Sequence, residues 1–289
     1  MNYLLHILIM INIYLILAFS LNLLIGYTGL LSICHAAFYG IGAYISTLLM
    51  VKLGLNFFLA LPLSILGAMA ISLCVSLPSL RLKGDYFILA TIGFQLIVFT
   101  ILYNWIGLTR GPYGIPGIPV PSLFGFEFST LPKYFLLTLI IVAGSFFVIR
   151  RILVSPFGRL LKAIREDELA TQALGKDVFR VKVLAFLIAA GMAAISGSLF
   201  AHYVTYIDPT SFTLEESIFI ATIIIVGGMG NLKGPVVGTV LLLIIPEVLR
   251  FLGIPDSVAA NLRQMIYALL LIGFMYFRPQ GIAGEYKFE

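Results

Sequence analysis

The stretch SPFGRLLKAIREDELATQALGKDVFRVK, residues 155–182, decides how this chain must fold, because it is a charged segment inside an otherwise apolar sequence. Hydrophobic residues make up 61% of the chain and charged residues only 11%, whereas a soluble domain carries about 25% charged residues. This share of charged residues is too small for a protein whose whole surface faces water. We therefore expect a membrane protein that keeps this charged segment in water.

Runs of roughly 20 apolar residues recur on both sides of the charged segment and indicate transmembrane helices. The predicted fold class is an all-α, polytopic integral membrane protein with about nine spans, and with eight to ten as the accepted range. Residues 1–289 form a single transmembrane domain in this interpretation, and 155–182 is a cytoplasmic segment within it. The expected spans are 3–25, 29–51, 57–80, 86–106, 134–153, 183–204, 217–229, 235–252 and 263–278. Glycine clusters or short length make 29–51 and 217–229 the two candidates for broken helices.

The orientation of the chain follows from its basic residues. Most of the 18 Lys and Arg residues fall in loops that would share one side of the membrane, with the charged segment among them. Because cytoplasmic loops are enriched in Lys and Arg, this side is expected to be cytoplasmic. Residues 107–133 then form the largest loop on the other side. The net charge of +5 thus marks orientation rather than binding to nucleic acid.

Local signals divide the charged segment into two short amphipathic helices. Ser155 followed by Pro156 is a typical helix start, with an N-cap residue and a proline at the first helical position. Asp167 can cap a second helix, which Gly175 ends. Such a segment either rests on anionic lipid or lies in a groove of a partner protein. The four acids interleaved with its six basic residues favour the partner protein.

Small residues mark close contacts between helices. A strip of small residues, each four positions from the next, lies on one face of the 183–204 span, and such strips let helices approach closely in lipid. A similar spacing follows the seventh span. The members of the first strip are Ala189, Ala193, Gly197 and Ala201, and those of the second are Gly230, Gly234 and Gly238.

Signatures of catalysis are missing from the sequence. The glycine-rich stretch 227–234 does not fit a nucleotide-binding P-loop, because Lys233 is followed by Gly234 and not by Ser or Thr. The three histidines lie far apart without a metal-binding spacing. We therefore expect no catalytic residues, no metal site and no cofactor, and ATP hydrolysis is not expected in this chain.

Polar residues within or at the edge of apolar spans tend to face a cavity or a partner, because they are costly in lipid. The candidates for a transport pathway are His35, Asp85, Gln95 and Glu216. Asp85 has a second interpretation, as a first-turn acid favoured by the helix dipole. An ion-coupled carrier that acts alone would more often carry acids in the middle of its spans.

The charged segment resembles the cytoplasmic coupling loop of permease subunits in branched-chain amino acid ABC importers, and most of the chain shares this resemblance. In the coupling loop the matching residues are Ser155, Pro156, Phe157, Gly158, Arg159, Ala163, Ile164, Arg165, Glu166, Asp167, Glu168, Ala173, Leu174 and Gly175. Elsewhere they include Gly29-Leu30-Leu31-Ser32, His35-Ala36-Ala37-Phe38, Arg81-Leu82-Lys83-Gly84-Asp85-Tyr86, Gly227-Gly228-Met229-Gly230, Gly234-Pro235-Val236-Val237-Gly238 and Phe277-Arg278-Pro279-Gln280-Gly281. The pattern is most similar to the M-type permease, one of two dissimilar permeases that pair in the importer.

The resemblance implies a multi-pass protein of the bacterial cytoplasmic (inner) membrane, surrounded by lipid and acting with partners. Two ATP-binding cassette subunits would dock on the charged segment. A second, dissimilar permease would complete the pore, and an extracytoplasmic binding protein would deliver the amino acid. Gln95 departs from the family, whose members often carry Glu there. The cargo thus stays open between branched-chain amino acids, urea or short amides, and another small solute such as a sugar. A stand-alone ion-coupled carrier and a polytopic membrane enzyme are further alternatives.

Overall fold

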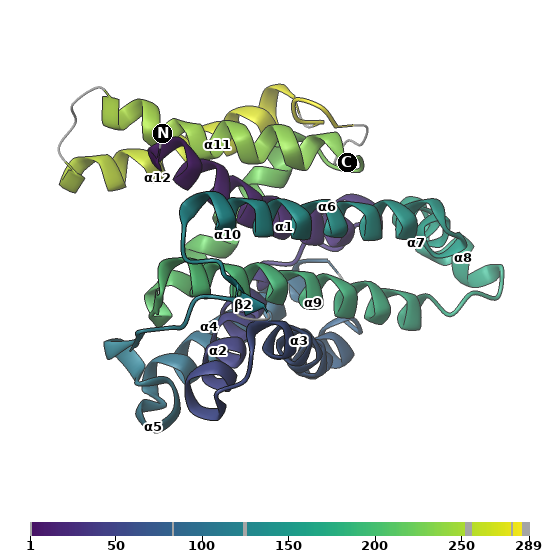
Figure 1. The fold of residues 1–289 in the computed structure, drawn as a ribbon. Helices are drawn as coiled ribbons and strands as arrows, with labels where there is room; N and C mark the ends of the chain where they lie inside the picture. The colour runs from purple at the N-terminus through teal and green to yellow at the C-terminus, as the bar shows by residue number, and fades with distance from the viewer. Residues whose placement is uncertain (1, 83, 124–125, 252–255, 279, 285–289) are drawn as a thin grey trace.

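The computed structural model describes the chain apart from residues 1, 83, 124–125, 252–255, 279 and 285–289, and most of it is helical (Figure 1). The α-helices are α1 (Asn2–Thr28), α2 (His35–Leu53), α3 (Phe57–Ser79), α4 (Asp85–Asn104), α5 (Ile106–Thr109), α6 (Leu131–Val154), α7 (Pro156–Glu166), α8 (Glu168–Ala173), α9 (Val178–Val204), α10 (Leu214–Gly227), α11 (Lys233–Phe251) and α12 (Asp256–Phe277). The minor elements are η1 (Gly111–Tyr113), η2 (Pro209–Phe212), β1 (Ile115–Pro116), β2 (Ser122–Leu123), β3 (Phe126–Glu127) and β4 (Tyr206–Ile207).

Within the described residues, six helices are long and apolar enough to cross a membrane, namely α1, α2, α3, α4, α6 and α9. Each predicted span overlaps a helix, but the predicted count of about nine spans is not confirmed. Helix α10 has 14 residues, which at 1.5 Å per residue is about 21 Å and falls short of the roughly 30 Å hydrocarbon core. The apolar segment predicted from residue 29 forms a helix only from His35.

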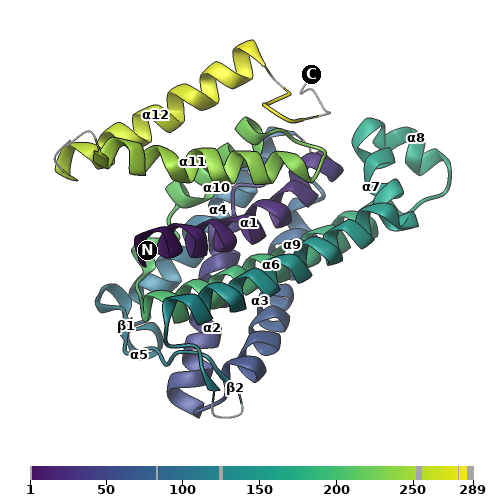
Figure 2. The same ribbon diagram turned by 45° about the horizontal axis from the view of Figure 1, so that its top comes forward.

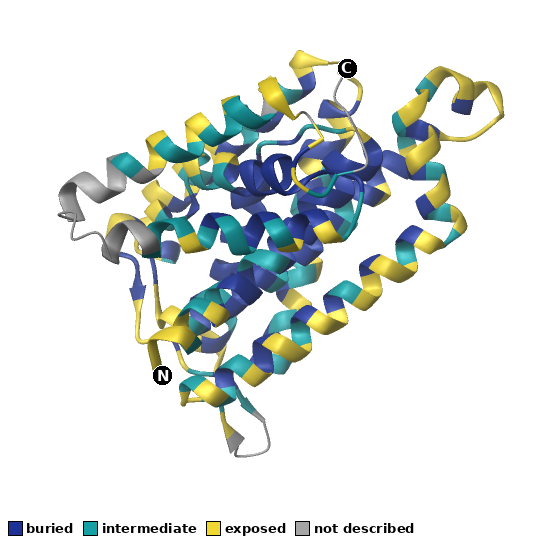
Figure 3. Ribbon diagram, turned by 90° about the horizontal axis from the view of Figure 1, so that it is seen from above, coloured by how far each residue is buried: buried dark blue, intermediate teal, exposed yellow. Residues whose placement is uncertain are grey.

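Helix α9 lies at the centre of the bundle and packs against α1, α2 and α3. Its small-residue strip is buried throughout. An added Cβ at Gly197 would collide with the backbone of Tyr39 and Ala43 in α2, and one at Gly42 would collide with Ala194 in α9. The strip predicted from the sequence therefore forms a close helix contact, at the buried centre seen in Figure 3.

Helix α2 begins beside the middle of α1 and not at its end. Gly29 (φ +73°) and Leu30 close α1, since their N–H groups donate to the carbonyls of Ile25 and Leu24 in a Schellman-like turn. Residues 29–34 then run back along α1 without helical structure. At the first residue of α2, His35 Nε2 lies 2.7 Å from Ser20 Oγ of α1, about 12 Å from the end of α1 by helical rise.

The charged segment forms α7 and α8, which Figure 2 shows at one end of the long helices α6 and α9. The two short helices predicted from the sequence are confirmed. Ser155 Oγ accepts a hydrogen bond from Gly158 N at 3.4 Å, and Asp167 Oδ1 accepts one from Ala170 N at 3.0 Å. Gly175 follows α8 with φ +75°, a conformation that glycine adopts without steric cost.

The loop 107–133 is tied to the loop before α10 by a short sheet. Strands β1 and β4 pair antiparallel, with Ile115 opposite Ile207 and Pro116 opposite Tyr206. Strands β2 and β3 form a small hairpin of their own. The β1–β4 pairing holds the connection between α4 and α6 beside the end of α9.

Candidate functional site

The charged segment has an inner face and an outer face. Leu161 and Ile164 are buried against the bundle, whereas Leu169 and Leu174 are 70% and 80% exposed. Burial of these leucines against another apolar surface would be favourable, because it removes apolar area from water. The outer face at α8 is thus suited to contact with another protein.

The predicted coupling residues divide between these two faces. Buried ones pack the segment onto the bundle, half-buried ones lie at its margin, and exposed ones are available to a partner. Gly158 and Ile164 are buried; Ser155, Phe157, Arg165 and Glu168 are half-buried; Pro156, Arg159, Ala163, Glu166, Asp167, Ala173, Leu174 and Gly175 are exposed.

Arg165 points inward and ties α7 to α1. Its side chain is only 11% exposed, and its Nη1 donates a hydrogen bond to the carbonyl of Gly26 in the last turn of α1. A cation at a helix C-terminus is favourable, because the carbonyls there carry partial negative charge. Glu166 pairs with Arg165 at 2.7 Å and is 63% exposed. A second ion pair, Lys182 with Glu168 at 2.6 Å, ties α9 to α8.

Asp85 lies at the same end of the molecule as the charged segment. It is in the first turn of α4, as one of its two interpretations predicts. It lines a cavity of about 650 Å³ together with Arg165, Glu168 and residues 28–31. The structure thus separates Asp85 from the other three pathway candidates.

His35 and Gln95 meet at the start of α2, inside the bundle. The first free N–H groups of this helix are satisfied by side chains from other helices, since Ala36 N donates to Ser217 Oγ at 2.9 Å and Ala37 N to Gln95 Oε1 at 2.7 Å. Gln95 Nε2 donates in turn to the Phe212 carbonyl at 2.8 Å. Neither His35 nor Gln95 lines the cavity that holds Asp85 or the one that holds Glu216.

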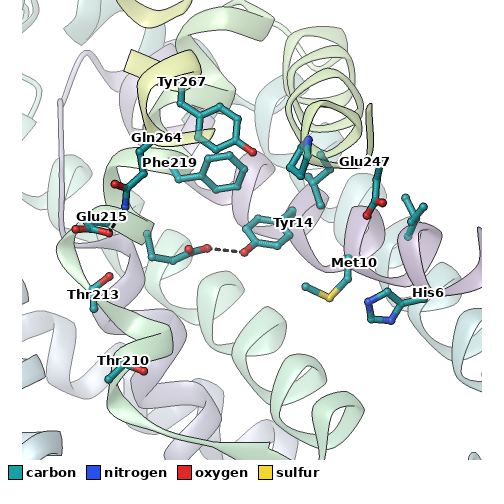
Figure 4. Close-up of a pocket in the computed structure, with 14 residues that line it drawn as sticks. His6, Met10, Tyr14, Thr210, Thr213, Glu215, Phe219, Glu247, Gln264 and Tyr267 are labelled. Carbon is teal, nitrogen blue, oxygen red and sulfur yellow. Dashed lines mark hydrogen bonds between the residues drawn. The ribbon is translucent and has the colours of Figure 1, made fainter. Parts of the chain in front are cut away.

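Glu216, the fourth pathway candidate, lines a separate, partly open cavity of about 490 Å³ between α1, α10, α11 and α12. The Tyr14 hydroxyl, from α1, donates a hydrogen bond of 2.6 Å to Glu216 Oε1 (Figure 4). Next to it, Glu215 Oε2 accepts from Gln264 Nε2 at 2.8 Å. We call this space the Glu216 cavity. It lies along the first half of α1, whereas Arg165 holds the last turn of that helix.

The aromatic and apolar wall of the Glu216 cavity could not be predicted from the sequence. Tyr14, Phe219 and Tyr267 lie on apolar helices far apart in the chain, and a single hydroxyl in an apolar run carries no functional signal of its own. Within the described residues, the structure contains no group of three or more His, Cys, Asp or Glu residues arranged to hold a metal ion.

The second strip of small residues lies where α10 meets α11. An added Cβ at Gly234 would collide with the Gly228 carbonyl, and one at Gly238 would collide with the Ile223 carbonyl. Gly230 has a different place, in the turn between the two helices with φ +83°, where its N–H donates to Asn22 Oδ1 of α1 at 3.3 Å.

Comparison with known proteins identifies the family. The model of the family described as "Branched-chain amino acid transport system / permease component" matches residues 3–275. The chain belongs to this family. It is 38% identical to the high-affinity branched-chain amino acid transport system permease protein LivM of Salmonella typhimurium and 37% identical to LivM of Escherichia coli. Each alignment covers 93% of this chain and 67% of the relative.

The permease protein LivH of Salmonella typhimurium is more distant, at 24% identity over 96% of this chain and 92% of that protein. The predicted resemblance to the M-type permease is therefore confirmed. The relatives are transport permeases, and with six apolar helices this chain is a multi-pass protein of the cytoplasmic membrane. No solved structure matches it.

Proposed function

We propose that this chain is a pore-forming permease subunit of an ATP-driven importer for branched-chain amino acids. A binding protein outside the membrane hands over the amino acid, a second and dissimilar permease completes the pore, and two ATPase subunits drive it. The chain contributes the path through the membrane and receives ATPase motion at residues 155–182. The names of LivM and LivH support the cargo.

The observation that carries the ATPase part of this proposal is the outer face of the charged segment. Leu169 on α8 and Leu174, the residue that follows α8, are exposed among charged residues, which is the surface expected of a helix that lies in a groove of a soluble partner. On the inner side, Arg165 and Lys182 tie the segment to α1 and α9. A displacement of α7 and α8 is therefore transmitted to the long helices α1 and α9 through charged side chains.

The test is uptake of labelled leucine in cells that lack their own branched-chain amino acid transporters. The chain is produced with the ATPases, second permease and binding protein that co-purify with it from native membranes. Leucine uptake is expected to require ATP hydrolysis and every one of these partners. Uptake by this chain alone, driven by an ion gradient, would reject the proposal.

The docking surface has its own test. Leu169→Ser combined with Leu174→Ser is expected to lower ATP-driven uptake about tenfold or more, because each leucine contributes roughly 1.5–3 kcal/mol when it is fully buried at an interface. The ATPases should also dissociate from the purified complex. The matched control is Leu53→Ser, an exposed leucine outside the charged segment, which is expected to leave both measurements unchanged. Full uptake by the double variant would place docking elsewhere.

A further inference from the structure

The Glu216 cavity has the shape and size of a small-molecule site. Its volume of about 490 Å³ falls within the range of about 300–1,000 Å³ that is typical of ligand pockets. Four helices contribute to its walls, so its shape depends on how the bundle is arranged. Figure 4 shows labelled side chains from the two ends of the sequence facing one another across it.

One wall of this cavity is apolar and aromatic. Met10 from α1, Phe219 from α10, Leu243 and Pro246 from α11 and Tyr267 from α12 line it. The rings of Phe219 and Tyr267 lie 4.8 Å apart, and Tyr14 meets Phe219 edge to face at 5.6 Å. A branched aliphatic group is favoured in contact with such a wall, because its apolar surface is then removed from water.

The polar groups in the cavity include the Glu216 carboxylate. The Tyr14 hydroxyl donates a hydrogen bond of 2.6 Å to its Oε1, which holds the carboxyl group at the cavity. Among the described residues, no other group is hydrogen-bonded to this carboxylate. The described residues that line the cavity include three carboxyl groups, from Glu215, Glu216 and Glu247, and one histidine, His6, but no Lys or Arg. An anionic ligand group therefore meets repulsion here, and a cationic one meets attraction.

We propose that the Glu216 cavity recognises the ammonium group of an aliphatic primary amine, with Glu216 accepting its hydrogen bond and the aromatic wall holding its branched chain. This inference rests on the proposed function and goes further than it, because it states which end of the amino acid is recognised in this subunit. It also excludes urea and short neutral amides as preferred ligands of this site. The carboxylate of the amino acid then points away from Glu216.

Three probes of almost the same shape and different charge test the site. They are isopentylamine, isovaleramide and isovalerate, which are cationic, neutral and anionic at pH 7. Their binding is measured by calorimetry on the membrane complex purified through a tag on this chain and held in lipid nanodiscs. The amine is expected to bind about tenfold or more tightly than the amide, since hydrogen bonds to charged groups are the stronger class. Equal binding of amine and amide would overturn the inference.

A pair of variants assigns the preference to Glu216. Glu216→Gln keeps the size of the side chain and removes its charge, so amine binding should weaken about tenfold while amide binding stays the same. Glu127→Gln makes the same charge change on an exposed residue of β3 that lines none of the described cavities, and should change neither. An unaltered amine preference in Glu216→Gln would refute the site. The comparison of probes on the unmodified protein stands even where the variant does not fold.

The outcomes separate this inference from the proposed function. If leucine uptake is driven by ATP but amine and amide bind equally, the cavity is not an ammonium site and the permease role stands. If the amine is preferred in a Glu216-dependent manner while uptake needs no ATPase, the site stands and the importer role fails.

Discussion

At the scale of single residues, Gln95 shows why a buried polar group in a membrane protein need not contact cargo. Its amide uses both ends: Oε1 accepts from Ala37 N and Ser217 Oγ, and Nε2 donates to the Phe212 carbonyl. An ionised glutamate could make the first two contacts but could not donate the third. Gln95 on α4 thus contributes to helix assembly, because its amide is hydrogen-bonded to α2, α10 and η2.

Gln95→Leu is expected to destabilise the protein, since it removes the acceptor of the buried Ser217 hydroxyl and the donor to the Phe212 carbonyl. Each such group costs about 1–3 kcal/mol. Thermal unfolding of the purified protein in one detergent measures the loss. Gln172→Leu, on the exposed surface of α8, serves as the matched control and should unfold close to the unmodified protein. If the two variants unfold at the same temperature, Gln95 has no such structural role.

At the scale of elements, Arg165 is the side chain of α7 that is hydrogen-bonded to α1, and Lys162 lies over the Tyr27 ring of α1 beside it. Arg165 is nearly buried and bonds to the Gly26 carbonyl, and its aliphatic part packs against Gly29. The neighbouring Arg159 is exposed. Two arginines of the same short helix therefore face different surroundings, with Arg165 linking α7 to the bundle and Arg159 available to a partner.

Arg165→Gln is expected to reduce ATP-driven uptake about tenfold without releasing the ATPase subunits, because it loosens α7 from α1 and leaves the outer face intact. Stimulation of ATP hydrolysis by the loaded binding protein should be lost in parallel. Arg159→Gln carries the same change of charge and should not disturb the link to α1. Release of the ATPases by Arg165→Gln would instead make Arg165 part of the docking surface.

The contact between α10 and α11 leaves no room for a side chain at Gly234. Gly234→Leu is expected to destabilise the protein, because overpacking a close contact typically costs about 1–3 kcal/mol and here the neighbouring atoms are backbone. Its yield and thermal unfolding are compared with those of Gly144→Leu, a helical glycine with open space around it. Matching behaviour of the two variants would contradict the packing argument.

At the scale of the whole molecule, the charged segment and the 107–133 loop are expected on opposite sides of the membrane. A reporter inserted after Gly175 should be active only in the cytoplasm, and one inserted after Gly117 only outside. Both glycines are exposed and have open space around them, so the insertions form a matched pair. A reporter after Gly175 that is exported would reverse the orientation.

The parts of this architecture that depend on local chemistry could be predicted from the sequence. Ser155, Asp167 and Gly175 bound the short helices of the charged segment because capping acts over a few residues. The start of α2 could not be predicted in this way, since its first N–H groups are satisfied by Gln95 and Ser217 from distant helices.

The same reasoning explains the number of spans and the missed cavity residues. An apolar run shows that a segment tolerates lipid, but not whether it is long enough as a helix to cross, and α10 with 14 residues is not. Tyr14 and Tyr267 become neighbours of Glu216 only when the two ends of the chain pack together. The side chain of Arg165 likewise points inward because α1 lies beside α7, and this neighbourhood could not be predicted from the charged segment alone.

The six residues 29–34 connect the end of α1 to the start of α2 and limit the distance between these two points. From Thr28 to His35 the chain makes seven Cα steps, and fully stretched these span at most about 25 Å. However the permease rearranges, the last turn of α1 and the polar cluster around His35 stay within that separation. If a movement of α7 displaces α1 through Arg165 by more than this connection allows, the first turn of α2 must move too. Ser217, which is hydrogen-bonded to that turn and is the sequence neighbour of Glu216, then moves with it.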